Sequence, residues 1–288
     1  LPITQNVLMS TDQKFLKLSA TNLEIAISTW IRMGNLEEEG AITVPARMLT
    51  EFVSSLPPKE IEVDSTTQPN VLALKCARFK ANINGTEAEE FPPIPTVESG
   101  VVATVEPGIL REAISHVAFA AATEDSRPVL TGIKVEMSGS DFTFAAADGF
   151  RLAVFKQKLA SAVDEDLSFI VPARALQEVN RLIGTQQEPI EFMVTPSKSQ
   201  VLFRLDGVEI VSQLIQGTFP NYSQLIPEGY EARVIVEQSA FLSATRTASI
   251  FARDGSGIVK LQASVANGAS GHLTVSSRAE ELGDNHGI

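Results

Sequence analysis

The sequence has few of the residues from which compact catalytic or metal sites are built. Its 288 residues include one cysteine, Cys76, and three histidines that are scattered along the chain. No disulfide framework can form, and the chain has neither a Cys/His zinc pattern nor a Gly-x-x-x-x-Gly-Lys-Ser/Thr phosphate loop. We therefore expect no cofactor and no metal, and a reducing, cytoplasmic compartment.

Long apolar runs and a basic charge balance are also missing. No stretch reaches the roughly 18 apolar residues that a membrane span needs, and no signal-like segment opens the sequence, so no membrane partner is expected. The formal net charge is −12, from 23 Lys and Arg against 35 Asp and Glu. That balance alone argues against a nucleic-acid-binding protein, although binding depends on where the charges lie.

The sequence does contain an internal repeat. Val44-Pro45-Ala46-Arg47-Met48-Leu49 returns as Val171-Pro172-Ala173-Arg174-Ala175-Leu176, 127 residues further on. Residues 20–27 align with 147–154 at the same offset, and Phe91-Pro92 aligns with Phe219-Pro220 at an offset of 128. Three anchors at nearly one spacing indicate a duplicated domain.

Residue periodicity around the repeat predicts an α+β fold. Amphipathic helices are expected after Pro45, after Glu106 and from Ala173 to about Gly184, each with one apolar stripe. A further helical pattern around Phe241 and Ala244 begins a third, partial unit. Alternating apolar residues predict antiparallel strands in the first 27 residues and at 42–44, 61–63, 71–75, 79–83, 133–135, 142–146, 152–155, 190–194, 201–204, 208–214, 259–261 and 273–275.

The repeat also predicts where the domains lie. We expect a first domain at residues 1–96, a complete second domain at 97–228 and a third at 229–288. The first lacks the leading helix of the second, and the third lacks its second half. The chain is therefore expected to be part of a longer protein of three similar units.

Several stretches together resemble the bacterial sliding clamp family, the beta subunit of DNA polymerase III. They are residues 124–130 (Glu-Asp-Ser-Arg-Pro-Val-Leu), residues 145–153 (Ala-Ala-Ala-Asp-Gly-Phe-Arg-Leu-Ala), both Val-Pro-Ala-Arg helices and the Phe-Pro closures. The resemblance covers the whole chain. It implies repeated processivity-fold domains, with helices packed on curved antiparallel sheets. It also implies a non-catalytic homodimeric ring around double-stranded DNA, loaded by a clamp loader and bound by DNA polymerase III alpha and other proteins with clamp-binding motifs.

A ring that slides should hold DNA through sequence-independent phosphate contacts, so we looked for arginines opposite the apolar helix stripes. At about 100° per residue, Arg174 and Arg181 fall together opposite the stripe of their helix. Arg47 and Arg246 take similar places, whereas Arg111 lies at the flank of its stripe. Ordinary solvated arginines are the alternative reading. The predicted DNA-binding residues are Arg47, Arg111, Arg127, Arg174, Arg181 and Arg246.

The resemblance further implies a hydrophobic pocket for partner peptides between the second and third domains, and a contact between subunits. The matching pocket positions are Leu130, Gly149, Phe150, Arg151, Leu152 and Pro227. Many relatives carry threonine where this chain has Ala147, which removes a hydroxyl from the rim. The expected subunit contact comprises Phe79, Ala81, Ile83, Ile250 and Phe251. For the aliphatic residues of both sets, burial in the core is the alternative.

A second class of function starts from the acidic residues. Asp125 and Asp148, with Glu124, could serve a metal-dependent phosphoryl-transfer enzyme such as a nuclease or phosphatase. The simpler reading makes Asp148-Gly149 a tight turn between strands, with Asp125 paired to Arg127.

Overall fold

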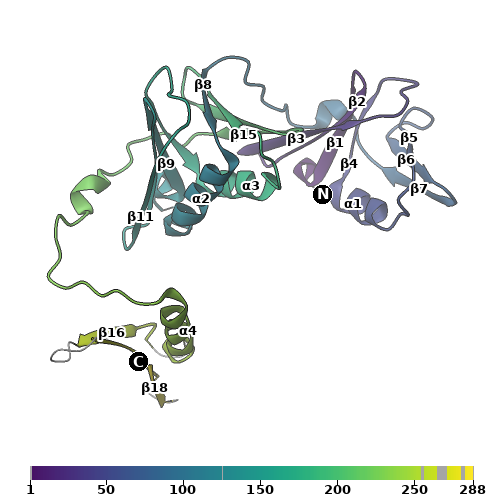
Figure 1. Cartoon of the computed structure of the whole chain (residues 1–288). Helices are drawn as coiled ribbons and strands as arrows, with labels where there is room; N and C mark the ends of the chain where they lie inside the picture. The colour runs from purple at the N-terminus through teal and green to yellow at the C-terminus, as the bar shows by residue number, and fades with distance from the viewer. Residues whose placement is uncertain (1, 125, 254–255, 265–270, 280–282, 288) are drawn as a thin grey trace. The chain divides into compact units, whose positions relative to one another are not determined.

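The structure is a computed structural model that describes residues 2–124, 126–253, 256–264, 271–279 and 283–287. The chain divides into two compact units, Leu1–Pro220 and Asn221–Ile288 (Figure 1). The first unit contains both copies of the long repeat.

The first unit is built on an eight-stranded antiparallel sheet to which both repeats contribute. Its strand order is β4-β1-β2-β3-β15-β14-β13-β8. The two repeats join where Ile27 of β3 lies opposite Ile210 of β15. The strands are β1 Asn6–Asp12, β2 Phe15–Thr21, β3 Ile25–Arg32, β4 Ala41–Pro45, β8 Val101–Val105, β13 Ile190–Val194, β14 Gln200–Leu205 and β15 Val208–Gln213.

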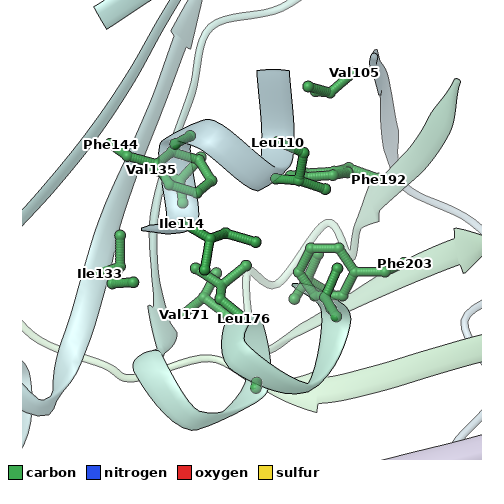
Figure 2. Close-up of a cluster of buried hydrophobic side chains, with 14 of the residues drawn as sticks. Val105, Leu110, Ile114, Ile133, Val135, Phe144, Val171, Leu176, Phe192 and Phe203 are labelled. Carbon is green, nitrogen blue, oxygen red and sulfur yellow. The ribbon is translucent and has the colours of Figure 1, made fainter. Parts of the chain in front are cut away.

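A four-stranded antiparallel sheet faces this one in the second repeat, and the main core lies between the sheets. Its order is β11-β10-β9-β12, from β9 Gly132–Ser138, β10 Asp141–Ala147, β11 Leu152–Lys158 and β12 Leu167–Pro172. Helices α2 (Pro107–Val117) and α3 (Ala173–Leu182) pack into the same core. Figure 2 shows the aliphatic side chains Leu110, Ile114 and Leu176 close to Phe203.

The first repeat has a smaller core. A three-stranded sheet of order β5-β6-β7 (Glu62–Asp64, Val71–Cys76 and Phe79–Asn84) supplies Leu72, Leu74 and Ile83. Helix α1 (Ala46–Ser54) covers this cluster with Leu49 and Phe52, both partly buried. Short 3₁₀ turns complete the unit at Ile3–Gln5 (η1), Ala88–Glu90 (η2), Ala118–Ala120 (η3) and Pro128–Thr131 (η4).

The repeated helices begin in the same way. Strands β4 and β12 end at Pro45 and Pro172, whose φ angles of −56° and −50° suit the residue before a helix. Helix α3 ends before Gly184, which takes φ +54°, as predicted for a residue beyond a helix C-terminus. The predicted helices are therefore confirmed, and so is the α+β class.

The second unit contains η5 (Tyr222–Leu225), helix α4 (Gln238–Arg253) and a three-stranded antiparallel sheet of order β16-β17-β18, formed by Val259–Ser264, His272–Ala279 and Gly283–Gly287. Ala248 of α4 is fully buried, and the Ser277 hydroxyl of β17 donates a hydrogen bond to its carbonyl. In the described part of the chain, no helix is both long and apolar enough to cross a membrane.

Candidate nucleic-acid and partner interfaces

Helices α1, α2 and α3 lie on one side of the eight-stranded sheet (Figure 1). In α3, Ala175, Leu176 and Val179 are fully buried, whereas Arg174 and Arg181 are exposed. In α1, the Arg47 side chain is 92% exposed. The predicted stripe is thus buried in α3 but only partly covered in α1, where Leu49 and Phe52 are half-buried and Met48 is 57% exposed. Both helices leave their arginines in solvent, on the same side of one continuous sheet (Figure 1).

Two of these arginines have carboxylate partners on their own helix. The Arg47 Nε lies 2.7 Å from Glu51 Oε1, and the Arg181 Nη2 lies 2.8 Å from Glu178 Oε2. The spacings, i to i+4 and i to i−3, are those at which helical side chains meet. The sequence contains these spacings, but the two ion pairs were not among the predictions made from it.

Arg111 has a different environment from the other helix arginines. It is half-buried on α2, and its guanidinium donates a hydrogen bond to the carbonyl of Gly184, just beyond α3. A cation suits the negative end of a helix dipole. The structure therefore gives Arg111 a role in holding α2 to α3, which its flank position did not predict.

Arg127 does not lie on a helix face. It precedes η4, and its guanidinium lies against Gly149, so that a Cβ built on Gly149 would be 2.9 Å from the Arg127 Nη1. Gly149 also has φ +95°, a conformation that side-chain-bearing residues rarely adopt. Arg127 is thus placed with the predicted peptide pocket, apart from the arginines of α1 and α3.

The turn between β10 and β11 is organised by Asp148. Its Oδ1 accepts hydrogen bonds from the backbone N–H groups of Phe150 and Arg151 at 2.9 and 3.0 Å, and its Oδ2 accepts one from Arg151 Nε at 2.9 Å. These backbone bonds, from Phe150 first, lower the pKa of the Asp148 carboxyl below its usual value. The tight-turn interpretation of Asp148-Gly149 is confirmed.

The turn presents an exposed aromatic side chain. Phe150 is 95% exposed at its tip, and the Arg151 guanidinium lies 5.7 Å from the centre of the Phe119 ring, which is 59% exposed. Leu152 is half-buried at the start of β11, and Leu130 of η4 is buried with 7% exposure. Phe119 adds an apolar surface that the sequence analysis did not select. Pro227, the remaining predicted pocket residue, is exposed in the second unit.

The predicted subunit-contact residues differ in accessibility. Phe79 is 40% exposed on β7, the edge strand of its sheet, and Ile250 is 54% exposed on α4. Ala81 and Phe251 are partly buried. Ile83 is only 6% exposed and packs in the core of the first repeat. Its side chain therefore belongs to that core, where it packs with the cluster of Leu72 and Leu74, and the contact prediction is corrected at this position.

The structure gives no support to the enzymatic alternative. The Asp148 carboxylate is used by the turn and by Arg151. Asp125 lies outside the described residues, so its expected pairing with Arg127 cannot be followed there. Within the described residues, no group of three or more His, Cys, Asp or Glu side chains is placed to hold a metal ion.

These features define a repeat-built α+β protein that presents paired helices on one side of shared antiparallel sheets, which is the processivity-fold class. Two family models match the chain: the DNA polymerase III beta subunit N-terminal domain over residues 1–95 and its central domain over residues 104–221. The chain belongs to the DNA polymerase III beta subunit family, whose members are non-catalytic sliding clamps that give the replicative polymerase its processivity.

Individual relatives agree with this assignment. The beta sliding clamp of Bacillus subtilis (strain 168) is 28% identical over 291 residues, covering 98% of this chain and 75% of the relative. That of Synechocystis sp. is 29% identical over 312 residues, covering 98% and 79%. The crystal structure of the Bacillus subtilis DNA polymerase sliding clamp superposes with a TM-score of 0.89 at 26% identity, over 100% of this chain and 76% of that one. The Thermotoga maritima beta subunit gives a TM-score of 0.87 at 25% identity, over 99% and 75%.

Proposed function

We propose that the protein encloses duplex DNA in a ring made by two subunits joined head to tail. Each subunit would contribute three similar domains, of which this chain carries residues 1–96, 97–228 and 229–288. DNA would pass along the helices, and the predicted contacts would come from Arg47, Arg174, Arg181 and Arg246. Arg111 and Arg127 would contribute less, because Arg111 is bonded to the Gly184 carbonyl and Arg127 lies against Gly149.

The observation that carries this proposal is the common placement of α1 and α3. Each helix follows a strand-ending proline and leaves an arginine exposed as its second residue. Exposed arginines attract phosphates whatever the base sequence, so they can hold DNA without creating stopping points. Arg246 of α4 is also exposed.

The acidic excess of the chain is compatible with this interior. The runs Glu37-Glu38-Glu39 and Asp164-Glu165-Asp166 are exposed and lie in segments between strands. Negative charge at such sites repels DNA from surfaces other than the helix face. A net charge of −12 therefore does not conflict with a locally basic opening.

We further propose that partner proteins dock at the β10–β11 turn. Leu130, Gly149, Phe150, Arg151 and Leu152 lie on or beside it, and Phe119 extends the apolar surface. Exposed apolar side chains gathered at one turn suit a short hydrophobic peptide. The proposed partners are DNA polymerase III alpha and other proteins with clamp-binding motifs, together with the clamp loader, in a bacterial cytoplasm.

The subunit contact would join the first domain of one copy to the third domain of another. Phe79 on the β7 edge and Ile250 on α4 are exposed apolar residues that such a contact would bury, with Ala81 and Phe251 at its margin. Ile83 would support β7 from the core side.

The proposal is tested by topology. The protein should stay on circular DNA after loading and leave when the circle is cut. Replacing Arg174→Glu together with Arg181→Glu should reduce loading and retention while leaving the thermal unfolding of the first unit intact. Lys14→Glu with Lys156→Glu makes the same charge change at exposed positions away from the helices and serves as the control. Retention of the arginine variant equal to that of the control would refute the assignment of the DNA face.

A further inference from the structure

The four helices of the proposed DNA face differ in charge. The helical residues of α1, α2 and α3 carry four arginines, at 47, 111, 174 and 181, and three glutamates, at 51, 112 and 178, for a formal net charge of +1. Helix α4 carries Arg246 and Arg253 and no acidic residue, for +2. The glutamates at 51 and 178 contact arginines of their own helices, so they lower the positive charge that α1 and α3 offer to a phosphate.

We propose that Glu51 and Glu178 are attenuating residues, which neutralise bore arginines locally so that the clamp holds DNA weakly enough to slide. This inference rests on the proposed function, because it assumes that α1 and α3 face the DNA. It assigns a role to two acidic side chains of this chain, and the ligand they regulate is the phosphate backbone of a duplex.

The contact geometry supports the assignment. Glu51 Oε1 lies 2.7 Å from Arg47 Nε, and Glu178 Oε2 accepts from both Arg181 Nε and Nη2 at 2.8 Å. Each carboxylate thus sits in direct contact with the guanidinium that would meet a phosphate. A phosphate that approaches Arg47 or Arg181 meets both charges, since they are far closer together than the screening length of roughly 8 Å at physiological salt.

Exposure decides how these pairs act. The side chains of Arg47 and Glu51 are 92% and 62% exposed, and those of Arg181 and Glu178 are 65% and 41% exposed. Exposed ion pairs are weak and break readily in water. The glutamates therefore do not lock the arginines away from DNA. They lower the net attraction at each arginine, which can still turn toward a passing phosphate.

Arg174 provides the contrast within the same helix. It is exposed, and among the described residues it forms no ion pair. Helix α3 therefore presents one unpaired and one paired arginine, and α1 presents one paired arginine. The attraction of the first unit for DNA would rest mainly on Arg174, while Arg47 and Arg181 supply contacts that are made and released at little cost.

The expected effect can be measured as a salt dependence. Each phosphate neutralised by a cation steepens the slope of log K against log salt by about 0.9 for duplex DNA. Glu51→Gln with Glu178→Gln would strengthen two partly attenuated phosphate contacts and steepen the slope by up to about 1.8. Between 50 and 200 mM salt, the variant should lose up to about tenfold more affinity for a short duplex than the unmodified protein loses.

The experiment titrates a short fluorescent duplex with the complete protein across this salt range. The control is Glu62→Gln with Glu209→Gln, which removes the same charge from two ion-paired glutamates on strands, where Glu62 pairs with Lys75 at 2.8 Å and Glu209 with Arg204 at 3.0 Å. A steeper slope for the helix variant than for the control supports the inference. Equal slopes for the two variants overturn it, because any gain would then reflect total charge.

A third variant separates this inference from the proposed function. Arg47→Gln with Arg181→Gln removes the arginines themselves and should make the slope shallower. If it does so while the glutamate variant behaves as the control, the DNA face stands and the attenuating role is refuted. If the arginine variant leaves the slope unchanged, α1 and α3 do not face DNA, and both conclusions fail.

Discussion

The repeat supplies a matched pair of core substitutions, Leu176→Ala in α3 and Leu49→Ala in α1. The two leucines occupy equivalent positions of the repeated helix, 127 residues apart. Leu176 is 0% exposed and lies among side chains of both sheets and α2, including Ile114, Val171 and Phe203 (Figure 2). Leu49 is only partly buried against the smaller core of the first repeat. The same chemical change should therefore have unequal consequences.

The expected magnitudes follow from burial. Leu176→Ala removes fully buried methyl groups and leaves a cavity in a core closed on all sides, which costs about 3–5 kcal/mol of unfolding free energy. Leu49→Ala loses only part of a leucine transfer energy of about 1.5–3 kcal/mol and leaves an opening that solvent can reach, so about 1 kcal/mol is expected. With a urea m-value of about 3 kcal/mol/M, the midpoints should fall by about 1.3 M and 0.3 M.

The assay is urea unfolding followed by the fluorescence of Trp30, the only tryptophan of the chain. Trp30 lies on β3, where its Nε1 donates to Asp12 Oδ2 at 2.8 Å, and β3 pairs with β15 of the second repeat. Because the sheet is continuous, Trp30 should report the loss of Leu176 although it lies in the other repeat. Equal midpoints for the two variants would refute the burial argument. A Trp30 signal that ignores Leu176→Ala would show that the repeats unfold separately.

Two further predictions concern the pocket and the acid range. Phe150→Ala should abolish binding of a clamp-binding peptide, measured by fluorescence anisotropy, without lowering the urea midpoint, because Phe150 is 95% exposed and contributes little to the core; unchanged peptide affinity would move the pocket elsewhere. Asp64 accepts hydrogen bonds from the hydroxyls and backbone N–H groups of Thr66 and Thr67, from the Thr67 hydroxyl most strongly, and these bonds lower its pKa to about 2. Since a lowered pKa means that the ionised form is favoured in the folded state, Asp64 stabilises the fold above about pH 4, and this stabilisation is lost as the pH falls toward 2. An NMR titration that places the pKa of this carboxyl near 4 would contradict the turn geometry.

The helices were the most predictable part of the fold, because their signals are local. Pro45 and Pro172 mark helix starts, and the apolar stripe beyond each has an unambiguous helical period. Strand ends were less predictable. Strand β11 continues to Lys158 through polar residues that face solvent at the sheet surface, so the apolar alternation stops before the hydrogen bonds do.

Three strands were not predicted, and each for a physical reason. Strand β8 (Val101–Val105) carries apolar residues on its exposed face as well, such as Val102 at 41% exposure, so its residue types do not alternate although its burial does. Strand β12 (Leu167–Pro172) is buried at three consecutive apolar positions, 169–171, and therefore also lacks the alternation that was sought. Strand β18 (Gly283–Gly287) is rich in glycine, aspartate and asparagine, which have low strand propensity, and it exists through its pairing with β17. Whether such a segment forms a strand depends on its pairing with a neighbouring strand, and the local sequence pattern does not predict that pairing.

The candidate site divides in the same way. Arginine exposure on α1 and α3 followed from the helical wheel, whereas the bond from Arg111 to Gly184 depends on how α2 packs against α3 and could not be read from α2 alone. The position of Arg127 against Gly149 likewise depends on the fold, since 22 residues and two strands separate them. Sequence patterns therefore predict which face a side chain takes on its own element, but they do not predict its neighbours on other elements.

The direction of the arginines is ultimately set by strand register. Pro45, the last residue of β4, lies opposite Asn6 of β1, and Pro172, the last residue of β12, lies opposite Gly132 of β9. Each ladder thus fixes where its helix begins, and Arg47 and Arg174 follow as the second helical residues. A shift of one residue between ladder and helix would rotate each arginine by about 100° and bring it toward the core. The burial of Val44 and Val171, both fully enclosed, opposes such a shift in each copy. Buried strand residues therefore determine the direction of the arginine side chains. Duplication of the whole strand-proline-helix segment could thus duplicate the proposed DNA-facing surface in one step.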